Sequence, residues 1–181
     1  MDKEKVITTT LELLKTKKLE KTSIGEILKI VGVSSGNLYY HFKSKNDIYK
    51  EVLNYSFEEI IKTLSAVDLK RDTQNSLFNL SKNLIKFLEE REEILFFLMN
   101  IRGSSYLDDY IDISKFLLRI KNLYRKEITE FDTEKDFILK IRMFLGSIYE
   151  ILYINKLRNK KLTEKEIEKI FDIYWKIEKN N

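Results

Sequence analysis

The residue types that most enzymes and metal sites need are nearly absent from this chain. Its 181 residues include no cysteine and a single histidine, His41. The absence of thiols excludes disulfides, thiolate zinc sites and a cysteine nucleophile, and a single imidazole excludes histidine-rich metal sites. A Ser-His-Asp triad could use His41, but most other histidine-dependent chemistry is excluded. We therefore expect no catalytic residue, no metal and no cofactor, and we expect the chemistry of the chain to be binding.

The polar residues that could bind a partner concentrate around His41. The run from Val33 to Lys45 has the sequence VSSGNLYYHFKSK, in which small polar residues precede two tyrosines, the histidine and two lysines. Residues 1–50 carry ten Lys or Arg and six Asp or Glu, so this stretch accounts for the whole net charge of +4. A basic module favours binding to nucleic-acid phosphates, although a solvated basic surface would show the same asymmetry.

Two short helices are predicted to position this run. Ser23 and Glu26 have the spacing of a capping box, which predicts a helix over residues 24–31 that Gly32 ends in a sharp turn. Ser34 then caps a third helix, in which Leu38 and Phe42 form an i, i+4 core pair. A helix, a tight glycine turn and a second short helix that begins with small polar residues are typical of the helix-turn-helix motif. The second helix of that motif enters the major groove of DNA.

The same run, with Thr22 and the turn at residues 32–34, resembles the signature of the TetR family of transcriptional regulators, especially its multidrug-responsive members. The resemblance covers about residues 3–55. It implies a helical DNA-binding domain followed by a variable helical regulatory domain. The sequence departs from the family pattern at Lys18, where Gly is usual, at Leu28 and Val31, where Ala is frequent, and at Ser35, where Lys is common.

Nine residues are predicted to contact double-stranded operator DNA. The first turn of the third helix should approach base edges, and Asn37 is the best candidate for direct readout because an asparagine pairs bidentately with adenine. The tyrosine hydroxyls and the histidine ring N–H beyond it suit phosphate contacts, as does a lysine at the start of the fourth helix. The predicted contacts are Thr22, Ser34, Ser35, Gly36, Asn37, Tyr39, Tyr40, His41 and Lys45.

The composition predicts an all-α fold. Proline is absent, there are only five glycines, and no stretch alternates apolar and polar residues clearly enough to require a sheet. We expect a helix-turn-helix domain over residues 1–50, a connecting helix over 45–66, and a ligand-binding and dimerisation domain over 67–181. The longest apolar run, Ile94 to Met99, has six residues and is too short to span a bilayer, so we expect a cytoplasmic protein with no membrane partner.

The last two predicted helices have more apolar surface than one core requires. From Glu134 to about Arg158 the apolar residues surround the helix, which predicts burial on all sides, and in the last helix they cover about 200°. Either a second copy of the chain or one large monomeric core would cover this surface, and dimerisation through these helices is similar to the mode of the TetR family. The predicted homodimer interface is Ile141, Leu145, Ile148, Leu152, Ile167, Ile170, Phe171 and Tyr174.

Aromatic residues in the regulatory domain could line an apolar cavity, although such residues more often form plain core. The candidate ligand contacts are Phe97, Tyr106, Tyr110, Phe144 and Tyr149. We therefore expect a homodimeric transcriptional regulator, a repressor that a small apolar or aromatic ligand releases from DNA. The alternative is a helical adaptor that has lost DNA binding, for which the departure at Ser35 is the only support.

Overall fold

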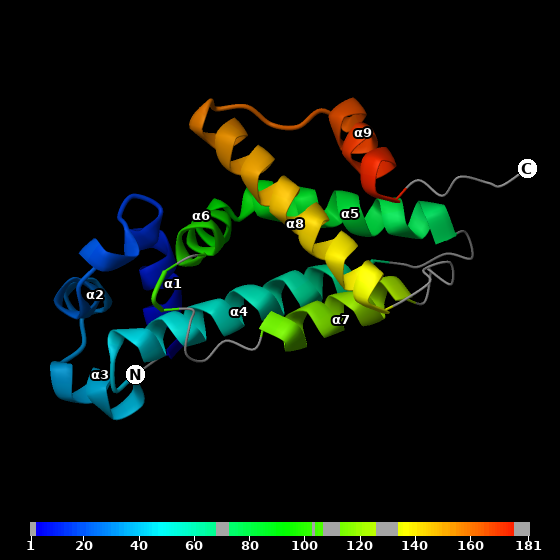
Figure 1. Ribbon diagram of the computed structural model, residues 1–181. Helices are drawn as coiled ribbons and strands as arrows, with labels where there is room; N and C mark the ends of the chain where they lie inside the picture. Colours follow the sequence, from blue (N-terminus) through cyan, green and yellow to red (C-terminus); the bar gives the residue numbers. More distant parts are fainter. Residues whose placement is uncertain (1–2, 68–72, 103, 107–112, 126–133, 176–181) are drawn as a thin grey trace, which may run out of the picture. The chain divides into compact units, whose positions relative to one another are not determined.

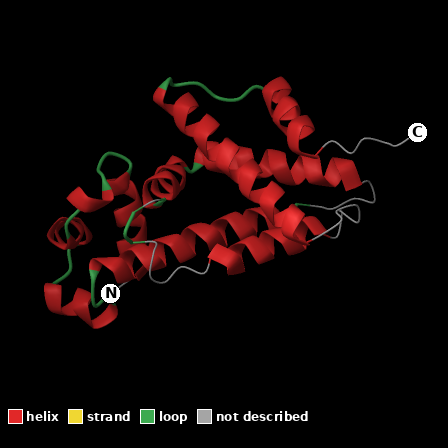
Figure 2. Cartoon of the chain, viewed as in Figure 1, coloured by secondary structure: helices red, strands yellow, loops and turns green. Residues whose placement is uncertain are grey.

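The computed structural model describes residues 3–67, 73–102, 104–106, 113–125 and 134–175. Within these ranges the chain forms helices joined by turns and loops, with no strand (Figures 1 and 2), which confirms the all-α prediction. The elements are α1 (Lys3–Leu14), the 3-10 turn η1 (Leu19–Lys21), α2 (Ile24–Val31), α3 (Ser35–His41), α4 (Lys45–Ser65), α5 (Thr73–Glu90), α6 (Glu92–Ile101), α7 (Ile113–Arg125), α8 (Glu134–Leu157) and α9 (Glu164–Trp175).

The first of two compact units contains α1 to α3, the first part of α4, and α6. It comprises residues 1–58 and 91–111. Helix α1 packs against both α2 and α6, and an ion pair of 2.8 Å between Lys15 Nζ and Glu92 Oε1 joins α1 to α6. Helix α6 therefore packs with the helix-turn-helix elements, although it lies in the range 67–181 that the sequence assigns to regulation. The functional division between the two predicted domains remains a prediction.

The second compact unit contains the end of α4 together with α5, α7, α8 and α9, over residues 59–90 and 112–181. Helix α5 contacts α8 and α9, and α7 contacts α8. The rings of Phe78 and Phe171 meet edge to face at 5.3 Å, which packs α5 against α9. Glu89 on α5 also accepts a hydrogen bond of 2.8 Å from the backbone N–H of Leu162, which fixes the loop between α8 and α9 to α5.

Within one chain, helix α8 is buried on one side only, so its predicted burial on all sides would need a second chain and stays a prediction. Its side chains Ile141 and Ile148 are buried in the second unit, but Leu139 is 58% exposed and Met143 is 55% exposed. On α9, Ile173 is 75% exposed. The number of apolar residues around a helix does not reveal how many neighbours the helix has, and these two helices have neighbours on one side within this chain.

Helical spacing of apolar residues also predicts a first helix from about Lys3 to Lys17 and a later one from Ile113 to Ile128. Helix α1 ends at Leu14 rather than near Lys17, and α7 ends at Arg125, beyond which the predicted continuation to Ile128 lies outside the described residues. Over the described ranges, no helix is both long enough and apolar enough to cross a bilayer.

Candidate nucleic-acid interface

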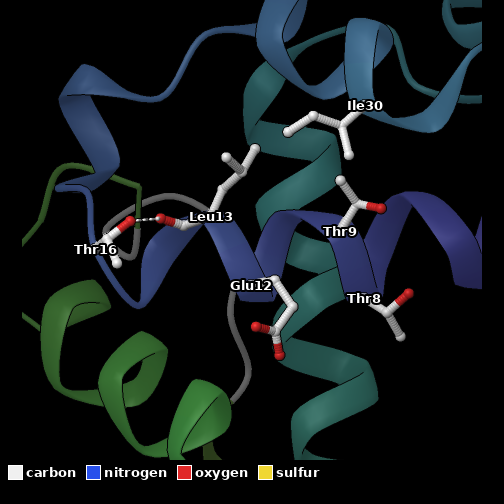
Figure 3. Close-up of a pocket in the computed structure, with 6 residues that line it drawn as sticks. All are labelled: Thr8, Thr9, Glu12, Leu13, Thr16 and Ile30. Carbon is white, nitrogen blue, oxygen red and sulfur yellow. Dashed lines mark hydrogen bonds between the residues drawn. The ribbon is translucent and has the colours of Figure 1, made fainter.

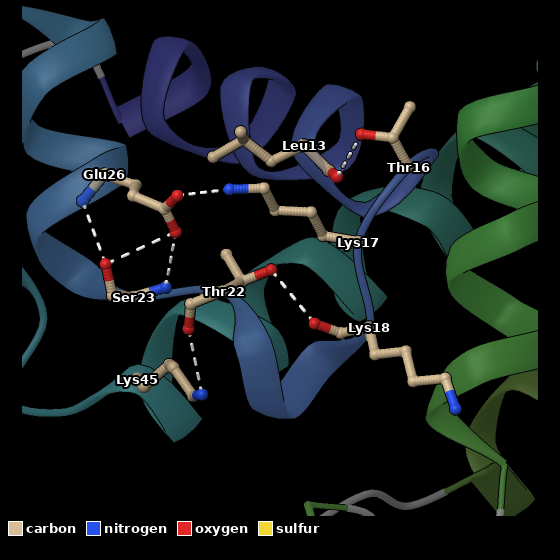
Figure 4. A network of polar contacts seen from close by, with 8 residues as sticks. All are labelled: Leu13, Thr16, Lys17, Lys18, Thr22, Ser23, Glu26 and Lys45. Carbon is tan, nitrogen blue, oxygen red and sulfur yellow. Dashed lines mark hydrogen bonds and ion pairs between the residues drawn. The ribbon is translucent and has the colours of Figure 1, made fainter.

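A capping box fixes the start of α2, as predicted. Ser23 Oγ accepts a hydrogen bond of 3.2 Å from the backbone N–H of Glu26, and Glu26 Oε2 accepts one of 3.1 Å from the N–H of Ser23 (Figure 4). Lys17, in the segment after α1, forms an ion pair with the same carboxylate. Its ammonium and the Ser23 N–H together lower the pKa of the Glu26 carboxyl. The box therefore ties α2 to the end of the α1 segment.

Gly32 ends α2 in the left-handed conformation that the sharp turn requires. Its φ is 76°, a value that L side chains rarely adopt, and its N–H donates to Leu28 O at 2.9 Å. The ammonium of Lys5, on α1, donates to Val31 O at 3.0 Å. A cation at the negative end of the helix dipole stabilises this end of α2. Sequence analysis missed this contact because Lys5 lies 26 residues away and no local pattern marks it.

Helix α3 presents one apolar face to the core and a polar face to solvent. Ser34 Oγ accepts from the backbone N–H of Asn37 at 3.4 Å and caps the helix. Leu38 and Phe42 are buried, which confirms them as the core pair. The predicted base-edge residues Ser34, Ser35, Gly36 and Asn37 are all exposed.

The aromatic residues that follow lie on the outer face of α3. Tyr39 is 50% exposed and Tyr40 is 85% exposed, whereas His41 is half-buried. The rings of Tyr40 and His41 meet edge to face with centroids 4.9 Å apart. An exposed tyrosine on a short helix contributes little to a core, so these side chains are available to a partner.

Thr22 and Lys45 are bound to the body of the first unit. Thr22 is 1% exposed, and its hydroxyl donates to Lys18 O at 3.2 Å, so the structure gives no support to a DNA contact by this side chain. Lys45 Nζ donates to Leu19 O and to Thr22 O, each at 3.0 Å (Figure 4 draws the second bond). These bonds use two of the three ammonium hydrogens, and the side chain is half-buried.

Two tyrosine rings flank the Lys45 ammonium. Its Nζ lies 5.6 Å from the ring centroid of Tyr49 and 5.3 Å from that of Tyr106, and the two rings meet edge to face at 4.9 Å. The buried hydroxyl of Tyr49 donates to Leu19 O at 2.7 Å, and burial raises its pKa. Tyr106, a candidate ligand contact by sequence, therefore packs beside the start of α4.

The other described candidate ligand residues are buried, each within its own unit. Phe97 is buried in the first unit, with its ring centroid 6.5 Å from that of Tyr49. Phe144 and Tyr149 are buried in the second unit, where the Phe144 ring meets that of Trp175 at 5.3 Å. Tyr110 lies outside the described residues. These contacts are those of core residues, and ligand binding by any of them remains a prediction.

A shallow groove of about 370 Å³ lies instead on the first unit, between α1 and α2 (Figure 3). The hydroxyls of Thr8 and Thr16 donate to carbonyl oxygens of their own segment, those of Glu4 at 2.9 Å and Leu13 at 3.4 Å. Ile30 lies opposite them and is 55% exposed. No candidate ligand residue lines this groove, which is formed by Thr8, Thr9, Glu12, Leu13, Thr16 and Ile30.

Most of the predicted dimer-interface residues lie inside the second unit of a single chain. Seven of the eight are buried, and the half-buried eighth, Tyr174, hydrogen-bonds Ser147 across the packing of α9 on α8. The buried residues are Ile141, Leu145, Ile148, Leu152, Ile167, Ile170 and Phe171. Their direct contact with a second chain remains a prediction, and the outward faces of the same helices carry other residues.

A capped helix, a left-handed glycine turn and an exposed polar helix face together define a helix-turn-helix regulator that binds DNA. The sequence profile of the bacterial regulatory proteins of the tetR family matches residues 6–52. Over these residues the chain is similar to the DNA-binding region of the TetR family of transcriptional regulators. It is a DNA-binding transcription regulator and not an enzyme.

Relatives extend this likeness beyond the helix-turn-helix. The HTH-type transcriptional regulator SAR0097 of Staphylococcus aureus (strain MRSA252) is 26% identical over 178 residues, covering 96% of this chain and 92% of that protein. The biofilm operon icaADBC negative transcriptional regulator IcaR of S. aureus (strain Newman) is 26% identical over 156 residues, covering 81% of this chain and 82% of IcaR.

A solved structure supports the fold over nearly the whole chain. A protein from Shewanella sp. PV-4, described as a tetR family transcription regulator, superposes with a TM-score of 0.80 at 18% identity, covering 97% of this chain and 96% of that one. The agreement includes the helical region that follows the DNA-binding unit.

Proposed function

We propose that α3 enters the major groove of operator DNA with its N-terminal turn foremost. The observation that carries this proposal is the exposed polar face of α3, which has no role in the core. Small side chains at Ser35 and Gly36 allow the backbone to approach the bases closely. The side-chain amide of Asn37 has no hydrogen-bond partner among the described residues, so it can pair with an adenine edge.

Phosphate contacts hold α3 in register. The exposed hydroxyls of Tyr39 and Tyr40 and the half-buried ring of His41 follow the base-contacting turn and suit backbone oxygens. The ammonium of Lys45 donates two hydrogens to Leu19 O and Thr22 O, so its third hydrogen can be donated to a phosphate oxygen. Lys45 would then join a phosphate to the turn that precedes α2.

The regulator acts as a homodimer in this proposal. Two recognition helices must sit about 34 Å apart, or a multiple of that distance, to reach successive major grooves. The C-terminal helices α8 and α9 form the dimerisation element, with the predicted interface residues packed behind their outward faces. Dimerisation is typical of the family and is consistent with apolar side chains exposed on both helices.

The sign of regulation is repression, and a small apolar or aromatic molecule releases the protein from DNA. IcaR, to which the chain is similar over most of its length, is a negative regulator, and release by ligand is typical of the family. Binding to operator DNA implies that the protein works in the cytoplasm. If the ligand lowers operator affinity by some factor, operator DNA lowers ligand affinity by the same factor.

A gel shift with the DNA upstream of the gene for this protein tests the proposal. The wild-type protein should retard this fragment at concentrations roughly a thousandfold or more below those needed for an unrelated fragment of equal length. Equal affinity for both fragments would contradict specific readout by α3. Failure to bind either fragment, even at low salt, would favour an adaptor that has lost DNA binding.

A further inference from the structure

The groups that fix the Lys45 ammonium are all neutral in the described part of the chain. Its Nζ donates to Leu19 O and Thr22 O at 3.0 Å each, and the ring centroids of Tyr49 and Tyr106 lie 5.6 and 5.3 Å from it. No carboxylate of the described residues forms an ion pair with Lys45. Carbonyl oxygens and aromatic faces attract a cation but carry no net charge, so the positive charge of Lys45 remains available to an anion.

This arrangement reduces the entropic cost of an anion contact. A free lysine has a flexible four-carbon stem, and ordering such a side chain at an interface lowers affinity. The Lys45 side chain is half-buried, and two carbonyl oxygens and two rings already hold its ammonium. A phosphate that accepts the third hydrogen therefore meets an ammonium that needs little further ordering.

The two rings that flank Lys45 differ in their other contacts. Tyr49 lies one turn further along α4 and is 1% exposed, and its hydroxyl donates to Leu19 O at 2.7 Å, so it belongs to the core. Tyr106 is half-buried, and its hydroxyl has no hydrogen-bond partner among the described residues. The ring of Tyr106 contacts the ring of Tyr49 and the Lys45 ammonium. Its contribution to this site is therefore the aromatic face beside the cation.

A turn after α6 places Tyr106 beside the start of α4. The backbone N–H and the hydroxyl of Ser104 both donate to Ile101 O, at 3.2 and 2.7 Å, which closes a turn at the end of α6. Ile101 is 2% exposed, and α6 packs against α1 within the first compact unit. Tyr106 therefore belongs to the DNA-binding unit, although it lies outside the residues 6–52 that match the family profile.

We propose that Tyr106 is a positioning residue for DNA binding: its ring holds the Lys45 ammonium where the third hydrogen reaches an operator phosphate. Tyr106 does not touch DNA in this arrangement and acts through Lys45. The role rests on the phosphate contact proposed for Lys45 and adds the residue that prepares it. Operator affinity then depends on a side chain from the range 67–181, which the sequence assigns to regulation.

Substitutions at position 106 in the full chain test this role, with operator affinity measured over a range of salt concentrations on folded protein. Y106L removes the aromatic face but keeps an apolar side chain. It should lower affinity about 3- to 10-fold and reduce the slope of log K against log salt toward that of K45M, which lacks the ammonium. Y106F keeps the ring and should bind like wild type. Y55L changes another half-buried tyrosine, about 15 Å along α4 from Lys45, and should leave the slope unchanged.

A double-mutant cycle separates positioning from stability. In the K45M background, Y106L should change operator affinity less than about twofold, because no ammonium is left to position. Equal losses in the wild-type and K45M backgrounds, or wild-type binding by Y106L, would overturn the positioning role and leave the phosphate contact of Lys45 intact. A loss in Y106F as large as that in Y106L would also overturn it, since the hydroxyl would then contact DNA directly. Unchanged affinity and salt slope in K45M would instead overturn the proposed phosphate contact itself, and the positioning role with it.

Discussion

The substitution Asn37→Ala isolates the predicted base contact from the stability of the protein. The side chain of Asn37 is exposed, and the cap of α3 uses its backbone N–H together with Ser34 Oγ. Alanine keeps that N–H, so the cap survives and the melting temperature should change little. Loss of a bidentate contact to a base costs about 1 to 3 kcal/mol, or roughly 5- to 150-fold in affinity for each recognition helix engaged.

Fluorescence anisotropy with the wild-type operator, with single-base variants and with random DNA measures this effect. N37A should lose affinity for the operator alone, and it should no longer discriminate at one base pair of each half-site. The same substitution at exposed Asn54 on α4, N54A, provides the control and should bind like wild type. If N37A binds operator and random DNA with equal loss, Asn37 contacts the backbone and the reasoning about base readout is refuted.

Three further substitutions test other parts of the structure. K45M should lower the slope of log K against log salt by about 0.9, one phosphate contact, and an unchanged slope would leave Lys45 with only its bonds to Leu19 O and Thr22 O. The pKa of the Glu26 carboxyl is lowered by Lys17 and the Ser23 N–H, so its stabilisation is present at neutral pH and is lost as the pH falls below the usual value of 4.5. The melting temperature of E26Q should therefore fall less than that of wild type as the pH is lowered below 4.5. Equal falls in the two proteins would show that the carboxylate does not stabilise α2. Y149A should destabilise the second unit by about 3 to 5 kcal/mol because Tyr149 is 4% exposed; a Y149A protein that melts like wild type but binds ligand weakly would identify a pocket residue.

Local sequence patterns predicted the DNA-binding elements because their determinants lie within a few residues. The Ser23 and Glu26 box and the Ser34 cap involve three-residue spacings, and the left-handed turn requires only Gly32. The core pair of α3 follows from helical periodicity. These features could therefore be placed before the fold was known.

Contacts between distant parts of the chain could not be predicted in this way. The bonds from Lys45 to two carbonyl oxygens span 26 and 23 residues, and the ring of Tyr106 comes from beyond α6. A lysine at a helix start has the same local sequence whether it faces a phosphate or a carbonyl oxygen. On α8, the buried and outward apolar residues differ only in which neighbours the fold supplies, so the sequence pattern alone could not show that Leu139 is exposed within one chain.

A footprint of the protein on the DNA upstream of its gene tests the central claim most directly. Two recognition helices related by a two-fold axis should protect two half-sites in inverted repeat, with centres about 10 base pairs apart or a multiple of that spacing. At a concentration at which the wild-type protein protects both half-sites fully, the N37A variant should protect neither. Uniform protection along the fragment, or equal protection by N37A and wild type, would contradict sequence-specific readout by α3.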